Sequence, residues 1–158
     1  MSPDPAHILQ IGTGFMASKT LLSAVELNLF SVLATGPMTA AQIGDRLALH
    51  PRSLRDFLDA LVSLRLLDRS GDDDDRVYSN TGDTGVFLDK ASPAYLGGIL
   101  EMANARLYGF WGNLTEALRT GKPQSEVKHG RAGFFEAVYA DESRLEQFLG
   151  AMGGIQLV

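Results

Sequence analysis

Residues 8–33 read ILQIGTGFMASKTLLSAVELNLFSVL, with a single lysine and a single glutamate among them. Apolar side chains recur here at alternating three- and four-residue steps, the spacing that brings them onto one face of an α-helix. This stripe consists of Ile8, Ile11, Phe15, Leu22, Val25, Leu29 and Val32, with Ser18 as its polar member. We therefore predict a helix over this stretch, bent near its glycines.

The same stretch is apolar on more than one side. A second set of apolar residues lies off the first stripe: Leu9, Met16, Leu21, Leu27 and Leu33. A helix with two apolar faces needs a packing partner for each of them. The rest of its own domain can cover one face, and a second copy of the chain is the economical cover for the other. We therefore predict a homodimer.

Two short helices are predicted to follow, over residues 39–64. Thr39 and Gln42 have the spacing of a capping box, in which a hydroxyl and an amide satisfy each other's free backbone donors at a helix start. Pro51 is preset for the first turn of the second helix. The buried stripe of that helix is expected to be Leu54, Phe57, Leu58, Leu61, Val62 and Leu64. Two helices joined by a tight turn indicate a helix-turn-helix.

A small β-hairpin is predicted next. Strand-like runs at residues 66–69 and 76–79 flank a loop of serine, glycine and aspartate at 70–75. Together with the preceding helices, this hairpin predicts a winged helix over residues 39–80.

The remainder of the chain is predicted to be helical. Ser92-Pro93 is a capping residue followed by proline, which indicates the start of a helical region that Gly109 and Gly112 should bend. Further helices are expected after a polar connector, at 134–139 and 142–152. The predicted fold class is mainly α: a helical dimerisation domain containing a winged helix-turn-helix with a small β-hairpin. It comprises dimer helices at 8–35, the winged helix at 39–80 and a helical region at 92–152.

Composition excludes several classes of function. A chain of 158 residues has the size of one domain, and its net charge of −5 opposes binding to nucleic acid or to an anionic membrane. It contains no cysteine, which excludes a disulfide or a thiolate nucleophile and fits a reducing cytoplasm. We find neither a signal peptide nor about 18 uninterrupted apolar residues. We expect a cytoplasmic protein with no nucleic-acid or membrane partner.

DNA binding is the main alternative function, because a winged helix is a common DNA-binding fold. Arg52, Arg55 and Arg65 lie on the second helix, where a transcription factor would read the major groove. The aspartates at 72–75 would instead repel phosphates at the tip of the wing. We favour a winged helix that serves as a scaffold, and a DNA-binding regulator remains the alternative.

Other possible site signals are weak. Residues 12–17, GTGFMA, match a glycine-rich dinucleotide motif, but the helical stripe continues through them and no strand–helix alternation surrounds them. The aspartate run lacks the spacing of a calcium loop, and the three histidines are scattered. We therefore predict no catalytic, cofactor-binding or metal-binding residue.

Residues 101–111 form the densest chemical patch, EMANARLYGFW. An amide, a guanidinium and a phenol lie among flat apolar groups, a mixture suited to an aromatic ligand held by apolar contact and oriented by a few polar groups. A core helix is the alternative interpretation of this stretch.

Several segments, in their order along the chain, resemble the plant-type and bacterial S-adenosylmethionine-dependent O-methyltransferases related to caffeate and hydroxyindole methyltransferases. The runs IGTGFMASK at 11–19 and AVELNLF at 24–30 are similar to their opening helices, and 39–61 to their winged helix. YGFWGNL at 108–114 and the segments 134–136 and 148–152 are similar to those that precede the cofactor domain.

This resemblance implies that the chain is an N-terminal domain that exchanges helices across a homodimer and closes one wall of an acceptor pocket. A C-terminal Rossmann-like domain would bind S-adenosylmethionine, and the whole protein would methylate a hydroxyl of an aromatic or natural-product acceptor. The cofactor loop, the ribose-binding acid and the histidine base of the family are absent before Val158. The apolar run at 155–158 stops abruptly, so we expect this chain to be a catalytically incomplete fragment that binds no cofactor itself.

The resemblance also implies substrate-binding residues. Phe15 and Met16 would reach the pocket of the partner. The pocket of the chain itself would be lined by Met102, Tyr108, Trp111, Phe148 and Met152, with hydrogen bonds from Asn104, Arg106 and Tyr108. On a helix, Met102 and Arg106 are four residues apart and should share a face, and Trp111 joins them only if Gly109 bends the chain. A stand-alone dimer that binds an aromatic molecule without chemistry is a third possible function.

Overall fold

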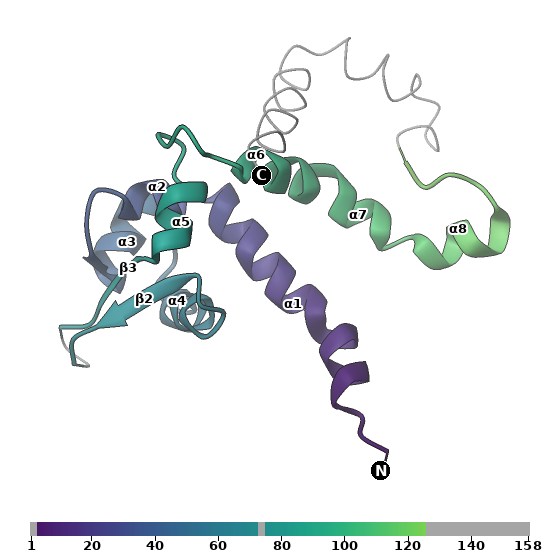
Figure 1. The fold of residues 1–158 in the computed structure, drawn as a ribbon, viewed down its shortest axis with the longest axis horizontal. Helices are drawn as coiled ribbons and strands as arrows, with labels where there is room; N and C mark the ends of the chain where they lie inside the picture. Colours follow the sequence, from purple (N-terminus) through teal and green to yellow (C-terminus); the bar gives the residue numbers. More distant parts are fainter. Residues whose placement is uncertain (1–2, 73–74, 126–158) are drawn as a thin grey trace. The chain divides into compact units, whose positions relative to one another are not determined.

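The computed structural model describes residues 3–72 and 75–125 and is mainly helical, as the sequence predicts (Figure 1). The chain divides into two compact units, residues 1–92 and residues 93–158, and each is described by itself. The predicted helices at 134–139 and 142–152 lie outside the described residues.

The first unit begins with the long helix α1, Ala6–Glu26, followed by the short helix α2, Leu29–Leu33. Helix α1 continues through Gly12 and Gly14 without a break, so the glycines do not interrupt it. The chain turns at Asn28 instead, whose φ of 59° lies in the left-handed region. A glycine inside a helix only weakens it, whereas a left-handed residue ends its hydrogen-bond ladder, and asparagine tolerates that conformation better than most residues.

Two helices follow close to their predicted positions. The capping box of α3, Ala40–Leu47, is confirmed: the Thr39 backbone N–H donates to Gln42 Oε1 at 2.8 Å, and the Gln42 N–H donates to Thr39 Oγ1 at 3.3 Å. Helix α4, Leu54–Ser63, begins three residues after Pro51, which lies in the turn before it. Of the predicted stripe, three leucines of α4 are buried, and Leu64 lies beyond the end of the helix and is exposed.

The predicted hairpin is part of a three-stranded antiparallel sheet. Strands β2, Leu67–Ser70, and β3, Val77–Asn80, pair with Leu67 opposite Asn80. Strand β1, Met38–Thr39, adds to the free edge of β3 and gives the order β1-β3-β2. Sequence analysis missed β1 because two residues are too few to show alternation. It also missed the short helix α5, Gly82–Phe87, which begins at the Thr81 side chain.

The core of this unit lies where α2, α3 and α4 meet the sheet. The largest fully buried side chains are Tyr78, Phe30, Leu29, Ile43, Leu58, Leu61 and Leu67. They come from segments far apart in the chain, so the hydrophobic effect of their burial holds the helices and the sheet together.

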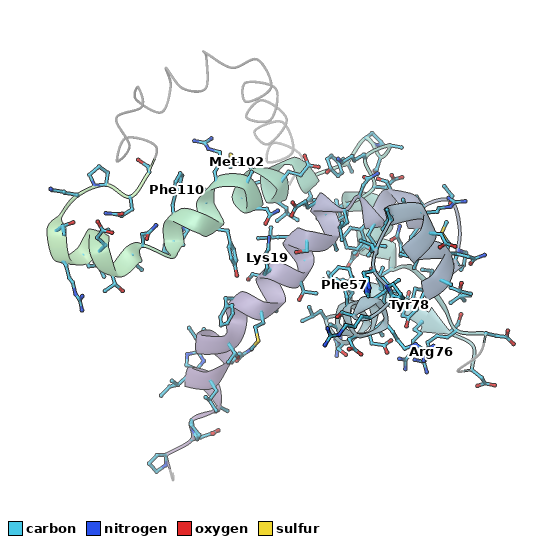
Figure 2. The ribbon with its side chains drawn as sticks, turned by 180° about the vertical axis from the view of Figure 1, so that it is seen from behind. Lys19, Phe57, Arg76, Tyr78, Met102 and Phe110 are labelled. Atoms are coloured by element: carbon cyan, nitrogen blue, oxygen red, sulfur yellow. The ribbon has the colours of Figure 1, made fainter. Side chains whose placement is uncertain are left out.

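A carboxylate on α4 ties this helix to the hairpin. Asp59 Oδ1 accepts hydrogen bonds from Arg69 Nη1 at 2.9 Å and from Tyr78 Oη at 3.0 Å, and Arg76 Nη1 lies 3.5 Å from Oδ2. Figure 2 labels two of these partners, Tyr78 and Arg76. Burial acts to raise the pKa of Asp59, but the two hydrogen bonds and both guanidinium charges outweigh it, so the pKa is lowered. Burial and the neighbouring carboxylate raise the pKa of Tyr78.

Replacing Asp59 with asparagine is expected to lower the free energy of unfolding at pH 7 by about 1–2 kcal/mol, a modest value because the carboxylate is 32% exposed. Since folding lowers the pKa of Asp59, its contribution is present at neutral pH and is lost as the pH falls through the folded-state pKa. Urea unfolding between pH 7 and pH 3 should therefore show that the free energy of unfolding falls less on acidification in Asp59→Asn than in the wild type. Asp68→Asn, at an exposed position on β2, is the matched control, and an equal effect in both variants would contradict the role of Asp59.

The second unit is one interrupted helical run: α6, Gly97–Met102; the π-helical turn η1, Ala103–Leu107; α7, Tyr108–Trp111; and α8, Leu114–Thr120. Gly121, with a φ of 65°, ends α8, because glycine adopts the left-handed conformation of a helix C-cap without steric cost. The predicted start at Ser92-Pro93 is wrong, because both residues lie in a turn and the helix begins at Gly97.

Tyr95 contacts the first turn of α6 at two points. Its ring lies so close to Gly97 that any side chain at position 97 would collide with it. Its hydroxyl donates a hydrogen bond to Glu101 Oε1 at 2.9 Å, one turn further along α6. Burial and the hydrogen bond to Glu101 both raise the pKa of Tyr95 above its ordinary value. This contact attaches the segment before α6 to its first turn.

Candidate functional site

Helix α1 exposes much of its apolar surface. Its only buried residues are Leu22, Ala24 and Val25, near its C-terminal end. Five large apolar side chains in its N-terminal half are exposed: Ile8, Leu9, Ile11, Phe15 and Met16. These include both residues that were expected to reach the pocket of a partner. An exposed apolar face of this length is typical of an association surface.

Two further properties of α1 concern its polar groups and its length. The hydroxyls of Thr13, Ser18 and Thr20 donate to backbone carbonyls four residues earlier. The polar side chains of α1 are therefore already hydrogen-bonded within the helix. Among the described residues, α1 is also the one helix long and apolar enough to cross a membrane, which sequence analysis did not anticipate. Core helices and signal sequences meet the same requirement.

The glycine-rich motif at 12–17 lies wholly within α1. A nucleotide-binding loop offers free backbone N–H groups at the start of a helix, whereas those of Gly12 and Gly14 lie in the middle of one. Nothing in the described structure lies within 4 Å of where a side chain at either glycine would begin. These residues therefore do not fit a cofactor phosphate or ribose, and the small residues leave room for another helix.

The predicted acceptor-wall residues lie on α6, η1 and α7 of the second unit. Met102, Asn104, Arg106 and Tyr108 are half-buried, and Trp111 is 69% exposed. Phe15 and Met16 belong to the first unit, and Phe148 and Met152 lie outside the described residues. The structure thus places five of the nine predicted residues on one helical run of ten residues.

The irregularity in this run is not at Gly109, which lies inside α7. It is the π-helical turn, in which the Tyr108 backbone N–H donates to the Ala103 carbonyl five residues earlier. A second interruption, at Gly112 and Asn113, separates α7 from α8 as predicted. Sequence analysis also missed Leu107, which is 39% exposed. The feature of the sequence that could have indicated Leu107 is the helical spacing, by three or four residues, of Leu107, Trp111, Leu114 and Leu118.

Three other features of the described residues were candidates for a site: charged clusters, a histidine and a surface hollow. Within residues 3–72 and 75–125, no three histidine, aspartate or glutamate side chains are grouped to hold a metal ion. His50 Nδ1 accepts a hydrogen bond from the Arg52 backbone N–H at 3.2 Å, which gives it a structural role. An open, polar hollow of about 400 Å³ lies at the turn into α3, and none of the predicted site residues lines it.

The first unit, with its small antiparallel sheet and its long, largely exposed first helix, and the second unit, an interrupted helical run, define a mainly helical protein with an apolar association surface on α1. The sequence of residues 9–90 matches the O-methyltransferase dimerisation domain. The chain belongs to this family.

Similar proteins extend this finding. The chain is 44% identical to the tetracenomycin polyketide synthesis 8-O-methyl transferase TcmO of Streptomyces glaucescens, over 96% of this chain and 42% of that protein. It is 38% identical to the N,N-dimethyltransferase OxyT of Streptomyces rimosus, over 90% of this chain and 40% of that protein. The crystal structure of human N-acetylserotonin methyltransferase in complex with SAM matches with a TM-score of 0.88 and 30% identity, over 99% of this chain and 47% of that one. The chain therefore spans less than half the length of these relatives.

Proposed function

We propose that this chain is the dimerisation and acceptor-binding part of a methyltransferase that uses S-adenosylmethionine to methylate a hydroxyl of an aromatic or natural-product acceptor. Its family and the names of its relatives support this proposal. One relative is an N,N-dimethyltransferase, so an acceptor amine is the alternative to a hydroxyl. Residues 12–17 do not form a phosphate-binding loop, and we assign the cofactor to a Rossmann-like domain outside the described residues.

The exposed apolar face of α1 is the observation that carries the proposal. Burying a large apolar side chain contributes about 1.5–3 kcal/mol, and a symmetric dimer buries each one twice. Because the polar side chains of α1 bond to its own backbone, they add little desolvation cost. We infer a homodimer in which α1 contacts the partner and Phe15 and Met16 approach the partner's acceptor pocket.

The acceptor-wall residues supply contact and orientation. Met102, Tyr108 and Trp111 offer the flat and polarisable surfaces that an aromatic ring prefers. Asn104, Arg106 and the Tyr108 hydroxyl supply directional hydrogen bonds that place the reacting group. These residues position the acceptor and exclude water from it. We assign no step of the methyl transfer to the described residues.

We further propose that α3, α4 and the β2–β3 hairpin form a winged helix used as a scaffold in a cytoplasmic protein. The guanidinium groups of Arg69 and Arg76 both contact Asp59, which neutralises charge that a DNA-binding wing would direct toward phosphates. The aspartates of the loop at 70–75 also disfavour DNA binding, because they would repel phosphates. No observation favours the DNA-binding alternative.

Sedimentation velocity of the 158-residue chain tests the proposal. At micromolar concentration we expect a dimer, independent of salt because the contact is apolar. Co-flotation with liposomes of phosphatidylcholine and phosphatidylglycerol is the companion measurement, and we expect the protein to stay unbound. A folded monomer at high concentration, or α1-dependent flotation, would contradict the proposed role of α1.

A further inference from the structure

The π-helical turn η1 is not explained by its sequence. Alanine, arginine and leucine are among the strongest α-helix formers, and four of the five residues from Ala103 to Leu107 are of these types. Intrinsic preference therefore predicts an ordinary α-helix here. π-Helical turns are rare, and many of them occur at functional sites. This one coincides with the proposed acceptor wall.

The turn changes which side chains line up. In an α-helix, residues four apart share a face, so Arg106 would follow Met102 and interrupt the apolar line with a charge. The hydrogen bond from the Tyr108 backbone N–H to the Ala103 carbonyl spans five residues instead of the four of an α-helix, so this turn contains one extra residue. Leu107 therefore follows Met102. From Leu107, the regular spacing of four residues in α7 leads to Trp111.

The N-terminal end of this run is held in place. Tyr95 contacts Gly97 and hydrogen-bonds to Glu101, the residue before Met102, so the first turn of α6 is attached to the chain that precedes it. Relative to this attached turn, the extra residue of η1 rotates α7 by one helical position. Because of this extra residue, Leu107 and not Arg106 lies in line between Met102 and Trp111.

We propose that Leu107 is a further acceptor-contacting residue, placed by the π-helical turn in line with Met102 and Trp111 to form one continuous apolar surface. This inference rests on the proposed function and extends it to specificity. A thioether, an isobutyl group and an indole in a row fit an elongated flat ligand, such as a phenol of two or more fused rings. The exposure of Leu107 and Trp111, 39% and 69%, leaves both accessible to such a ligand. Arg106 stands beside this row, where it can orient a polar substituent.

The test measures binding of 1,8-dihydroxyanthraquinone, a flat tricyclic phenol, to the protein expressed from the complete reading frame that encodes this chain. Leu107→Ala should weaken binding about tenfold, because it removes most of one apolar contact. Leu107→Met should restore it to within about twofold. Affinity for S-adenosylhomocysteine should stay unchanged in both variants, which a general loss of structure would not allow.

A deletion tests the alignment itself. Without Ala105 the run has the length of an ordinary α-helix, in which Met102 and Leu107 again fall one turn apart. This variant should fold, as judged by circular dichroism, and should bind the phenol within about threefold of the wild type. Val86→Ala, at an exposed position on α5 outside this helical run, is the control and should have no effect.

The outcomes separate two kinds of failure. If wild-type protein shows no saturable binding of the phenol, the proposed acceptor wall is wrong and this inference falls with it. If Trp111→Ala weakens binding but Leu107→Ala does not, the wall stands and only the role of Leu107 is overturned. A folded Ala105 deletion that binds no phenol would also overturn the alignment. If this variant does not fold, the comparison of Leu107→Ala with Leu107→Met is the deciding test of the proposal.

Discussion

Replacing Phe15 with aspartate is expected to weaken the dimer at least about hundredfold. The Phe15 side chain is 59% exposed on α1, and we place it in the contact with the partner. Because only the exposed part of the ring can be newly buried, the substitution removes roughly 1–2 kcal/mol of burial, twice in a symmetric dimer, and adds a carboxylate that must lose water. Each factor of ten corresponds to about 1.4 kcal/mol, so the burial loss alone gives about one to three factors of ten and the carboxylate adds to it. Sedimentation equilibrium across a micromolar range measures the change.

A matched control separates the interface from a general effect of charge. Val86→Asp introduces the same group at a position on α5 that is 48% exposed, and it should leave the dimer intact. Circular dichroism should show folded protein for both variants, because neither side chain belongs to the core. If both variants dissociate equally, or if Phe15→Asp remains dimeric, α1 is not the dimer contact.

Replacing Trp111 with alanine should reduce the affinity for 1,8-dihydroxyanthraquinone by about thirtyfold to hundredfold. An indole ring buries more apolar area than the other side chains of the wall, and aromatic stacking adds about 0.5–1.5 kcal/mol to that burial. The affinity for S-adenosylhomocysteine should remain nearly unchanged, because we assign the cofactor to a domain outside the described residues. Calorimetry on the protein from the complete reading frame measures both.

Trp111→Phe serves as the conservative variant and should retain most of the affinity, since it keeps a flat ring at the same place. Its loss should stay below about fivefold. Equal losses for the phenol and for S-adenosylhomocysteine would indicate a structural role for Trp111. No loss for either would remove α7 from the acceptor wall.

Local signals made much of this protein predictable. The capping box at Thr39 and Gln42, the glycine that ends α8 and the apolar stripe of α1 each depend on residues within a few positions of one another. Such signals act through backbone hydrogen bonds and side-chain spacing that a sequence displays directly. The family, too, was recognisable from the order of these segments, and its match to residues 9–90 confirms it.

The candidate site was predictable as a segment but not as a surface. Residues 101–111 stand out by composition, and five predicted residues do lie on one helical run. Which of them share a face depends on the π-helical turn. The residues from Ala103 to Leu107 favour an ordinary α-helix and do not predict that turn. The sequence therefore places Arg106, instead of Leu107, on the same face as Met102.

By itself, therefore, the sequence determined the helical class, the capped starts and stops of several helices, the apolar helix at the N-terminus and the family. Only the tertiary structure decided that the chain turns at Asn28, that β1 joins the sheet, that α6 begins at Gly97 and that η1 is wider than an α-helix. The physical reason is the range of the interactions. Strand β1 exists because it pairs with β3 nearly forty residues later, and the face that α7 presents depends on the extra residue in η1. Contacts between distant or irregularly spaced residues leave no periodic trace in a sequence.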